Sequence, residues 1–358
     1  MSSVERLSPK VEEQRLLEIA TQIPGSRIGC VSTGRAQAAE QFAIERPEAS
    51  VTAWYLDSYL AALATAHSTA LPNLNITCDA DWPCTEIDLA AIALSSHGEA
   101  ELTRDVIQSV YHALTIGGSM VVSVDNSRDR WLHDLLKTYE KSVKVRPFED
   151  AMVYVIQKSN ALKKIKNFSC QLSFIDCETK IEFVTRPGVF SHRELDSGAR
   201  QLLDAVDVFP EAKLLDIGCG AGSVAIGLAA RDPSAMVHAI DSSARAIDCT
   251  RRGMKLNGIG NMRIELNHSG NYGEEGYFDM AIANPPYFAD FRIAQHFIDL
   301  AHRSLRVGGR LVLVTKQPGW YEENLPIAYN EVEVFESKRY FIASGVKTSQ
   351  SISLTSDD

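Results

Sequence analysis

The chain has 358 residues, 45% of them hydrophobic, and a formal net charge of −10. This length predicts two domains of ordinary size, each able to bury its own core. No run approaches the roughly 18 uninterrupted apolar residues of a membrane span, and residues 1–15 are polar and charged, unlike a signal peptide. We therefore expect a cytoplasmic protein with no membrane segment, and we expect a monomer.

The seven cysteines are odd in number and form no C-x-x-C pair. This usage is typical of reduced, mostly buried thiols rather than of disulfides or zinc ligands. The sequence therefore predicts no metal site.

The first half opens with an apolar strand at residues 26–31, a helix at 33–44 and a second strand at 51–56. The same order returns from Lys213 onward. Arg27 and Lys213 are 186 residues apart, as are Pro47 and Pro233, whereas Asp88 and Asp279 are 191 apart. Gly117-Gly118 and Gly308-Gly309 also differ by 191. The chain is therefore predicted to be an internal duplication.

Both copies close in the same way. Strands at residues 119–124 and 310–314 follow the Gly-Gly turns, and each is followed by a hairpin-like pair, at 143–156 and at 332–343. Each half is thus predicted to be an α/β domain with a mostly parallel sheet and one antiparallel edge. Alternating residues at 168–175 and 180–184 predict a connecting hairpin, and we place the domain boundary between residues 165 and 166.

A glycine-rich turn follows the first strand of the second half. Gly218, Gly220 and Gly222 let the backbone turn tightly and approach a ligand closely. Asp216 precedes them, and Asp241 ends the next strand, where an acid can accept hydrogen bonds from ribose hydroxyls. The third glycine comes one residue too early for the nicotinamide pattern, so an adenosyl ligand is favoured. Cys219, between the glycines, is interpreted as a small spacer rather than a nucleophile.

The fourth strand, from Phe278, ends at Asn284 because two prolines follow, and proline lacks the N–H that a sheet needs. The Asn284 carboxamide and the Pro285 carbonyl can both accept from an NH2 group, and the ring of Tyr287, after Pro286, can lie against a planar base. Together with the glycine turn, this favours S-adenosylmethionine over a nicotinamide. A plain strand followed by a Pro-Pro loop is the alternative.

These motifs resemble the class I methyltransferases of the small-domain type, and among them the bacterial ribosomal RNA guanine-N2 methyltransferases. The resemblance covers residues 183 to the end and rests on an ordered set of segments: Pro187-Gly-Val-Phe-Ser, Leu195-Asp-Ser-Gly, Asp216-Ile-Gly-Cys-Gly-Ala-Gly, Asp241, Asn284-Pro-Pro-Tyr and Gly308-Gly309. It implies two tandem Rossmann-like methyltransferase domains, each with a seven-stranded mixed sheet. It also implies that the first is a degenerate copy.

The resemblance assigns further residues to the cofactor. It places the Phe190 and Asp196 region over the methionine end, for which a buried aromatic and a helix cap are the alternatives. Ser242 is also assigned to the cofactor, and the candidates for the contact near the adenine are Ser269, Gly270 and Asn271, of which we choose Ser269. The chain departs from the family pattern at the third strand, where an Asp or Asn near the adenine is usual, and at Tyr287, where the ribosomal RNA enzymes commonly have Phe.

The first copy lacks the cofactor motifs. Cys30, Ser32, Gly34 and Ala36 stand opposite Asp216 and the three glycines, Tyr55 stands opposite Asp241, and no Asn-Pro-Pro is present. We therefore expect a structural or RNA-positioning domain in residues 1–165 and the catalytic domain in 166–358.

The sequence thus favours methyl transfer to the exocyclic N2 amine of a guanine in ribosomal RNA, of the 16S type rather than the 23S type. The alternatives are an enzyme acting on adenine N6 or on protein glutamine, and a silent cofactor-binding protein. The net negative charge requires that contact with ribosomal RNA or a ribosomal subunit be local. The candidates, which are also explained by a solvated surface, are Lys158, Lys163, Lys164, Lys166, Lys180, Arg186, His192 and Arg193.

Overall fold

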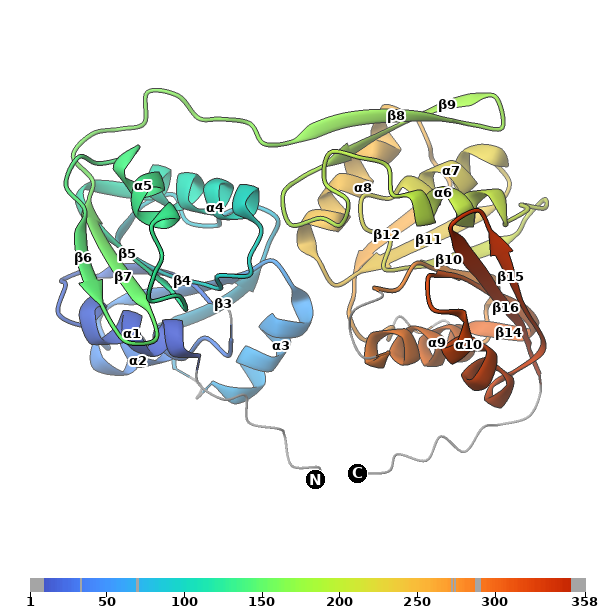
Figure 1. Cartoon of the computed structure of the whole chain (residues 1–358), viewed down its shortest axis with the longest axis horizontal. Helices are drawn as coiled ribbons and strands as arrows, with labels where there is room; N and C mark the ends of the chain where they lie inside the picture. Colours follow the sequence, from blue (N-terminus) through green and yellow to red (C-terminus); the bar gives the residue numbers. More distant parts are fainter. Residues whose placement is uncertain are drawn as a thin grey trace. The chain divides into compact units, whose positions relative to one another are not determined.

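The computed structural model describes residues 10–32, 34–68, 71–271, 273, 275–286 and 291–348. The chain divides into two units, Met1–Phe168 and Ser169–Asp358. The division falls three residues beyond the boundary expected from the sequence. Each unit contains a seven-stranded sheet, with five parallel strands and an antiparallel pair at one edge (Figure 1).

Unit 1 has the strand order β3-β2-β1-β4-β5-β7-β6. Its strands are β1 (Arg27–Val31), β2 (Ser50–Tyr55), β3 (Leu74–Cys78), β4 (Ile87–Leu94), β5 (Leu114–Val124), β6 (Lys144–Pro147) and β7 (Met152–Gln157). Its helices are α1 (Val11–Ala20), α2 (Gln37–Glu45), α3 (Ser58–His67), α4 (Ala100–Ala113) and α5 (Trp131–Lys137).

Unit 2 repeats this order as β12-β11-β10-β13-β14-β16-β15. Its strands are β10 (Lys213–Ile217), β11 (Met236–Asp241), β12 (Met262–Leu266), β13 (Phe278–Ala283), β14 (Leu305–Thr315), β15 (Tyr329–Ser337) and β16 (Tyr340–Lys347). Its helical segments are α6 (Ser197–Asp204), α7 (Ser223–Arg231), α8 (Ala244–Leu256), α9 (Arg292–Ser304), α10 (Pro318–Asn324) and the 3-10 turn η1 (Leu325–Ile327). The expected pair of seven-stranded mixed sheets is confirmed.

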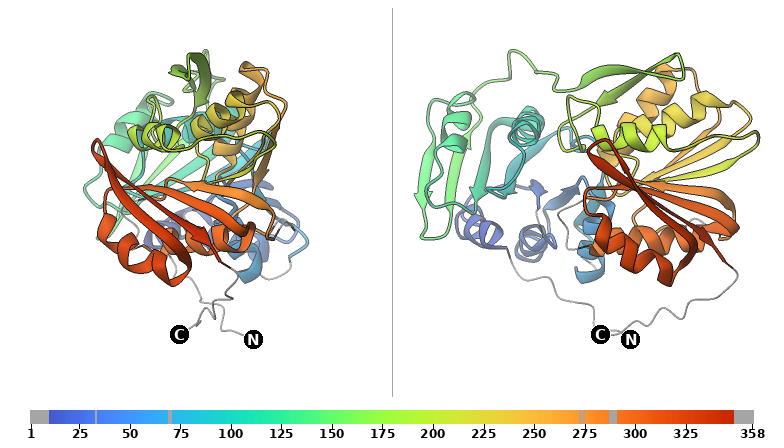
Figure 2. Two further views of the ribbon diagram at one scale, coloured as in Figure 1. Left: turned by 90° about the vertical axis from the view of Figure 1, so that its right-hand side faces the viewer. Right: turned by 45° about the vertical axis from the view of Figure 1, so that its right-hand side comes forward.

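Helices cover both faces of each sheet (Figures 1 and 2). Successive residues of a strand point to opposite faces, and β10 shows the result. Leu214 packs in the core beneath α6, α7 and α8, whereas Leu215 packs in the core beneath α9 and α10. A sheet buried on both sides needs nearly continuous apolar strands, which is what the sequence of β10 provides.

Matching hydrogen bonds confirm the duplication. Asn73 donates to the Ala43, Arg46 and Ala49 carbonyls, and Asn261 in unit 2 donates to Ala229, Asp232 and Ala235. Asp88 accepts the backbone N–H of Arg27 at 3.0 Å, and Asp279 accepts that of Lys213 at 2.8 Å. In each unit the asparagine thus joins the start of the third strand to the segment before the second strand, and the aspartate joins the fourth strand to the first.

A lysine closes the same helix end in each copy. Lys158 donates to the Tyr111, His112 and Leu114 carbonyls, and Lys347 donates to Leu305 at 2.7 Å. These carbonyls lie at the end of α4 and just after α9, where helical C=O groups lack intrahelical partners. Lys158 is 5% exposed, so its interpretation as a candidate RNA contact is wrong.

The predicted hairpin is present as β8 (Cys170–Asp176) and β9 (Thr179–Thr185), paired antiparallel. Cys177 and Glu178 have φ of 44° and 68°, the left-handed values that a two-residue hairpin turn requires. β9 packs on α8, and Arg186 beyond it is buried in an ion pair with Asp248 at 2.8 Å. Arg186 is therefore also excluded as an RNA contact.

Candidate functional site

The glycine turn joins β10 to α7, at the end of the sheet where open α/β folds bind ligands. Gly218, Gly220 and Gly222 all have positive φ, of 71°, 55° and 78°. A Cβ would lie 2.9 Å from the Phe297 ring at Gly218 and 2.7 Å from Thr250 at Gly222, but it would meet nothing within 4 Å at Gly220. Packing therefore requires the outer two glycines, and the middle one faces open space.

Asp216 lies just before this turn and is 3% exposed. Among the described residues, its Oδ2 has no hydrogen-bond partner. Burial, and then the nearby Asp241 carboxylate, raise the pKa of Asp216 to about 7. A buried carboxyl oxygen without a partner destabilises the fold unless a ligand satisfies it, so the Oδ2 of Asp216 is suited to a ligand that donates hydrogen bonds or carries positive charge.

Asp241, at the end of β11, is tied to the glycine turn. Its Oδ2 accepts the N–H of Gly220 and its Oδ1 accepts that of Ser243, both at 2.8 Å. A carboxylate can accept about four hydrogen bonds, so these two contacts orient Asp241 and leave it the capacity to accept from ligand hydroxyls. Ser242, which the sequence analysis assigns to the cofactor, is half-buried. Ser243, which the sequence analysis missed, caps α8 by accepting from the N–H of Ala246.

Cys219 is buried, and burial raises the pKa of its thiol well above the ordinary value. Its Sγ lies 3.5 Å from Oγ1 of Thr250, which also donates to the Gly220 carbonyl at 3.1 Å. A thiol held protonated is a poor nucleophile. These contacts support the interpretation of Cys219 as a spacer.

Asn284 follows β13, which ends at Ala283. Its Nδ2 donates to Asp196 Oδ2 at 2.8 Å. Because an ionised carboxylate can only accept, this contact orients the amide with its NH2 toward Asp196. The carboxamide oxygen is then the Asn284 atom that can accept from an amine. Pro285 is buried and Pro286 half-buried, and Tyr287 lies outside the described residues.

Asp196 also caps α6, because the same Oδ2 accepts the N–H of Ala199 at 2.7 Å. The helix-cap alternative and the contact with the candidate site are thus compatible. Phe190 is 54% exposed, so the alternative that it is a buried core aromatic is wrong. Its proposed position over the methionine end stays a prediction.

The turn after β12 carries Ser269. Asn267 organises this turn, since its Oδ1 accepts from the N–H groups of Ser269 and Gly270 at 3.0 and 2.8 Å. The sequence analysis missed Asn267, which is the side chain that positions Ser269. A short polar residue directly after a strand is the signal that could have identified it.

A second missed feature is an aromatic pair beside the candidate site. The rings of Phe291 and Trp320 are stacked, with centroids 4.7 Å apart and planes 8° from parallel. Phe291 is the N-cap residue of α9, the helix that follows β13, and Trp320 lies in the first turn of α10, the helix that follows β14. The pair therefore lies at the same end of the sheet as Asn284.

The corresponding region of unit 1 is filled by side chains. The Tyr55 hydroxyl donates to the Gly34 carbonyl at 2.8 Å. Glu13 from α1 is fully buried and accepts from the Ser32 hydroxyl and from the N–H of Ala38. Burial raises the pKa of this carboxyl group. Polar groups that face a ligand in an active copy are thus paired with one another here.

The described residues include no group of three or more His, Cys, Asp or Glu side chains arranged to hold a metal ion. Within the same residues, no helix has both the length and the apolar character needed to cross a membrane.

The strand order of unit 2 is consistent with a Rossmann-like methyltransferase domain. Residues 180–344 match the family model "Methyltransferase small domain". The chain is 32% identical over 159 residues to ribosomal RNA small subunit methyltransferase C of Pseudoalteromonas atlantica, covering 43% of this chain and 46% of that protein. It is 35% identical over 180 residues to the Chromohalobacter salexigens protein of the same name, covering 46% and 51%.

The chain thus spans about half the length of these curated relatives. A structure of the T. thermophilus 16S rRNA N2 G1207 methyltransferase in complex with AdoMet and guanosine matches 94% of this chain and 92% of its own, with a TM-score of 0.81 and 18% identity. At this identity the match establishes the fold of both units. Residues 180–344 thus resemble the methyltransferase small domain family, and the comparisons support the recognition of unit 2 as similar to the ribosomal RNA guanine-N2 methyltransferases.

Proposed function

We propose that the protein transfers a methyl group from S-adenosylmethionine to the exocyclic N2 amine of a guanine in 16S ribosomal RNA. The observation that carries the proposal is the Asp196–Asn284 contact, because it engages the NH2 of Asn284, so that the carboxamide oxygen is the side-chain atom suited to accept from an amine. The T. thermophilus protein of the same fold was solved with AdoMet and guanosine, and the curated relatives bear the corresponding name.

The residues of unit 2 fit this cofactor. Asp216 is a buried carboxylate that can accept hydrogen bonds from the amino group of the cofactor. The open space at Gly220 admits the part of the cofactor that would contact the backbone. Asp241 is already oriented by the Gly220 and Ser243 N–H groups, which prepares it to accept from ribose hydroxyls. Ser242, Ser269 and Phe190 complete the proposed cofactor set. When bound, S-adenosylmethionine supplies an electrophilic methyl group.

The chain's contribution to the reaction is the orientation of the amine. A guanine N2 amine is a weak nucleophile because its lone pair is delocalised into the ring. Two acceptors, Asn284 Oδ1 and the Pro285 carbonyl, would bind its two N–H bonds and stabilise the positive charge that develops on nitrogen. Besides this charge stabilisation, holding the amine in place would supply much of the rate acceleration of methyl transfer. We assign Tyr287, after Pro286, to contact with the base.

Mass spectrometry of nucleosides from 16S and 23S rRNA tests the proposal in a strain lacking the gene. We expect one N2-methylguanosine to disappear from 16S rRNA and to return when the gene is restored. Restoration with Asn284→Ala should fail. Loss of N6-methyladenosine or of a methylated glutamine, or no change in any of these, would contradict the proposal.

A further inference from the structure

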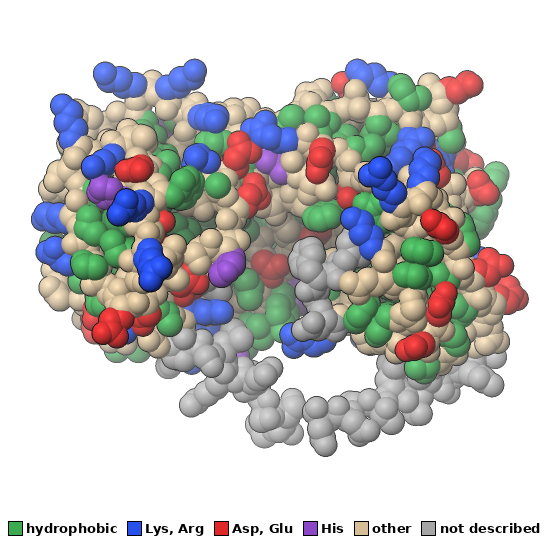
Figure 3. Space-filling model, viewed as in Figure 1, with side chains coloured by type: hydrophobic (Ala, Val, Ile, Leu, Met, Phe, Trp, Pro, Cys, Tyr) green, Lys and Arg blue, Asp and Glu red, His purple; other side chains and the backbone are tan. Residues whose placement is uncertain are grey.

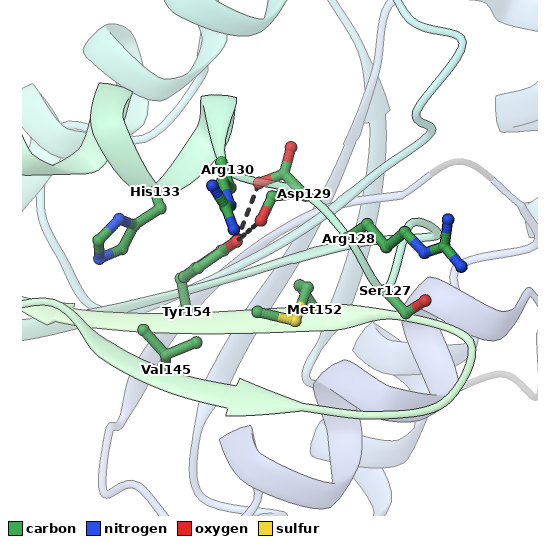
Figure 4. A pocket seen from close by; sticks show the side chains of 8 residues that line it. All are labelled: Ser127, Arg128, Asp129, Arg130, His133, Val145, Met152 and Tyr154. Atoms are coloured by element: carbon green, nitrogen blue, oxygen red, sulfur yellow. Dashed lines mark hydrogen bonds between the residues drawn. The ribbon is translucent and has the colours of Figure 1, made fainter.

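Unit 1 has an open pocket of about 600 Å³ just beyond β5 (Figure 4). It is lined by residues that include Arg128, Asp129, Arg130, His133, Met152 and Tyr154. The first three belong to the connection between β5 and α5, and His133 lies on α5 itself. The pocket therefore occupies the end of the sheet where α/β folds bind ligands, although unit 1 lacks the cofactor motifs.

The pocket lies in a basic part of an acidic chain. Residues 127–166 contain ten Lys and Arg against five Asp and Glu, whereas the whole chain has a net charge of −10. Figure 3 shows Lys and Arg side chains gathered over the left-hand side of the view, where Figure 1 places α5, β6 and β7. All of these cations except Lys158 are exposed, and six of them lie around α5 and β6: Arg128, Arg130, Lys137, Lys141, Lys144 and Arg146.

These six cations make no salt bridge with any described residue. Three of the five acids in the segment make their contacts with other residues, and one of them, Asp150, is neutralised by Arg15 from outside the segment. Asp129 accepts from the Tyr154 hydroxyl at 2.9 Å, and Asp150 pairs with Arg15 at 2.9 Å. Glu140 accepts from the Tyr111 hydroxyl and from Ser159.

The arginines of unit 2 differ in this respect. Many of them are paired with acids, as in Arg231–Asp176 at 2.7 Å, Arg252–Asp248 at 3.0 Å and Arg306–Asp279 at 2.6 Å. The concentration of unpaired cations around α5 and β6 is therefore a local feature. Guanidinium groups match the geometry of phosphate oxygens, and clustered cations of this kind are the electrostatic signature of a nucleic-acid contact.

An exposed aromatic ring directly follows Arg130 in the sequence. Trp131, the first residue of α5, is 40% exposed, and the Arg104 guanidinium lies 4.9 Å from its ring centroid. Cations interleaved with an exposed indole suit a nucleic acid, because bases stack on aromatic rings while phosphates bind the cations. An acidic protein segment would use the charges but not the ring.

We propose that this pocket and the six cations around it bind the phosphate backbone of RNA, so that the degenerate unit is a substrate-binding domain. Arg128 and Arg130 contact phosphates at the pocket, and the cations on α5 and β6 extend the contact. The proposal rests on the proposed function, in which RNA is the substrate. It assigns the RNA contact to a surface that takes no part in methyl transfer.

Fluorescence anisotropy with a labelled 20-nucleotide oligouridylate tests this assignment without any methylation step. For the full chain, Arg128→Gln with Arg130→Gln should weaken binding roughly tenfold and reduce the slope of log K against log salt by about 1.4, corresponding to two phosphates on a single strand. Arg128→Lys with Arg130→Lys should retain the slope, because the charges remain.

The matched control removes two exposed cations from α8 of unit 2, by Arg251→Gln with Lys255→Gln, and should leave the slope unchanged. Thermal unfolding of each variant checks that the fold is retained. An unchanged slope for the Arg128 and Arg130 pair, or polyglutamate binding as tight as RNA binding at equal ionic strength, would overturn the proposal. Neither result bears on nucleoside analysis of the rRNA, so the two proposals fail separately.

Discussion

Asp196 links two parts of the candidate site through a single oxygen atom. Its Oδ2 accepts from Ala199 at the start of α6 and from Asn284 after β13. The residue therefore fixes both the beginning of a helix and the direction of the catalytic amide. We regard Asn284 as the catalytic residue and Asp196 as a positioning residue that acts through it.

Substitution at these two positions separates the roles. Asn284→Ala removes an acceptor where charge develops, so kcat should fall by roughly 10²–10³ while cofactor affinity changes little. Asp196→Ser keeps a good helix cap but is too short to hold Asn284, so kcat should also fall while the melting temperature is nearly unchanged. Asp196→Asn, which retains an acceptor of the same length, should recover much of the loss in kcat. Single-turnover methyl transfer and calorimetric cofactor titration measure these effects. A loss of cofactor binding in Asn284→Ala, with transfer intact at saturating cofactor, would move Asn284 into the cofactor pocket.

Asp216 makes the stability of unit 2 depend on pH. Burial and Asp241 raise its pKa to about 7, from the ordinary aspartate value near 3.8 that applies in the unfolded chain. Between these values the unfolded chain has lost the proton and the folded protein retains it, so stability without cofactor falls as pH rises through this range. The contribution is on the order of 1–4 kcal/mol.

Asp216→Asn should remove this contribution. The variant should be more stable than the parent at pH 8 and closer to it at pH 4, and it should bind S-adenosylmethionine more weakly because the acceptor carboxylate is gone. Scanning calorimetry at the two pH values, with and without cofactor, measures both effects. Equal stability differences at pH 4 and pH 8 would show that Asp216 is ionised in the folded protein.

At the scale of elements, the duplication was predictable because it is local in sequence. The Asp88 and Asp279 offset located β4 and β13, and alternation located the β8–β9 hairpin even though Cys177-Glu178 is not a usual turn pair. Long-range contacts leave no such pattern. Lys158 and Lys347 bind carbonyl groups, which every residue carries, and the partner of Asn284 is 88 residues away. The motifs therefore led to a set of candidate site residues, but not to the direction of the Asn284 amide, the role of Asn267 or the Phe291–Trp320 stack.

At the scale of the whole molecule, the two units share a fold but differ in the residues that lie at the carboxyl ends of their central strands. Unit 2 presents Gly220, facing open space, and Asp241 oriented by backbone N–H groups. Unit 1 presents Tyr55 bonded to Gly34, and a buried Glu13 bonded to Ser32. Retaining the fold while losing the cofactor is possible because the sheet core and the binding turn use different residues.

This difference predicts one S-adenosylmethionine per chain, bound by unit 2. Gly220→Asp should abolish binding, because it places a carboxylate in the open space at the turn and close to Asp241, and because positive φ favours glycine. Tyr55→Phe, at the position of unit 1 that corresponds to Asp241, removes only the hydroxyl that bonds Gly34 and should leave both affinity and stoichiometry unchanged. Isothermal titration calorimetry on the full chain measures both quantities. A stoichiometry of two, or binding that survives Gly220→Asp and is lost in Tyr55→Phe, would mean that the first copy retains a cofactor site. The side chains that fill the carboxyl ends of its strands would then have to move aside in solution.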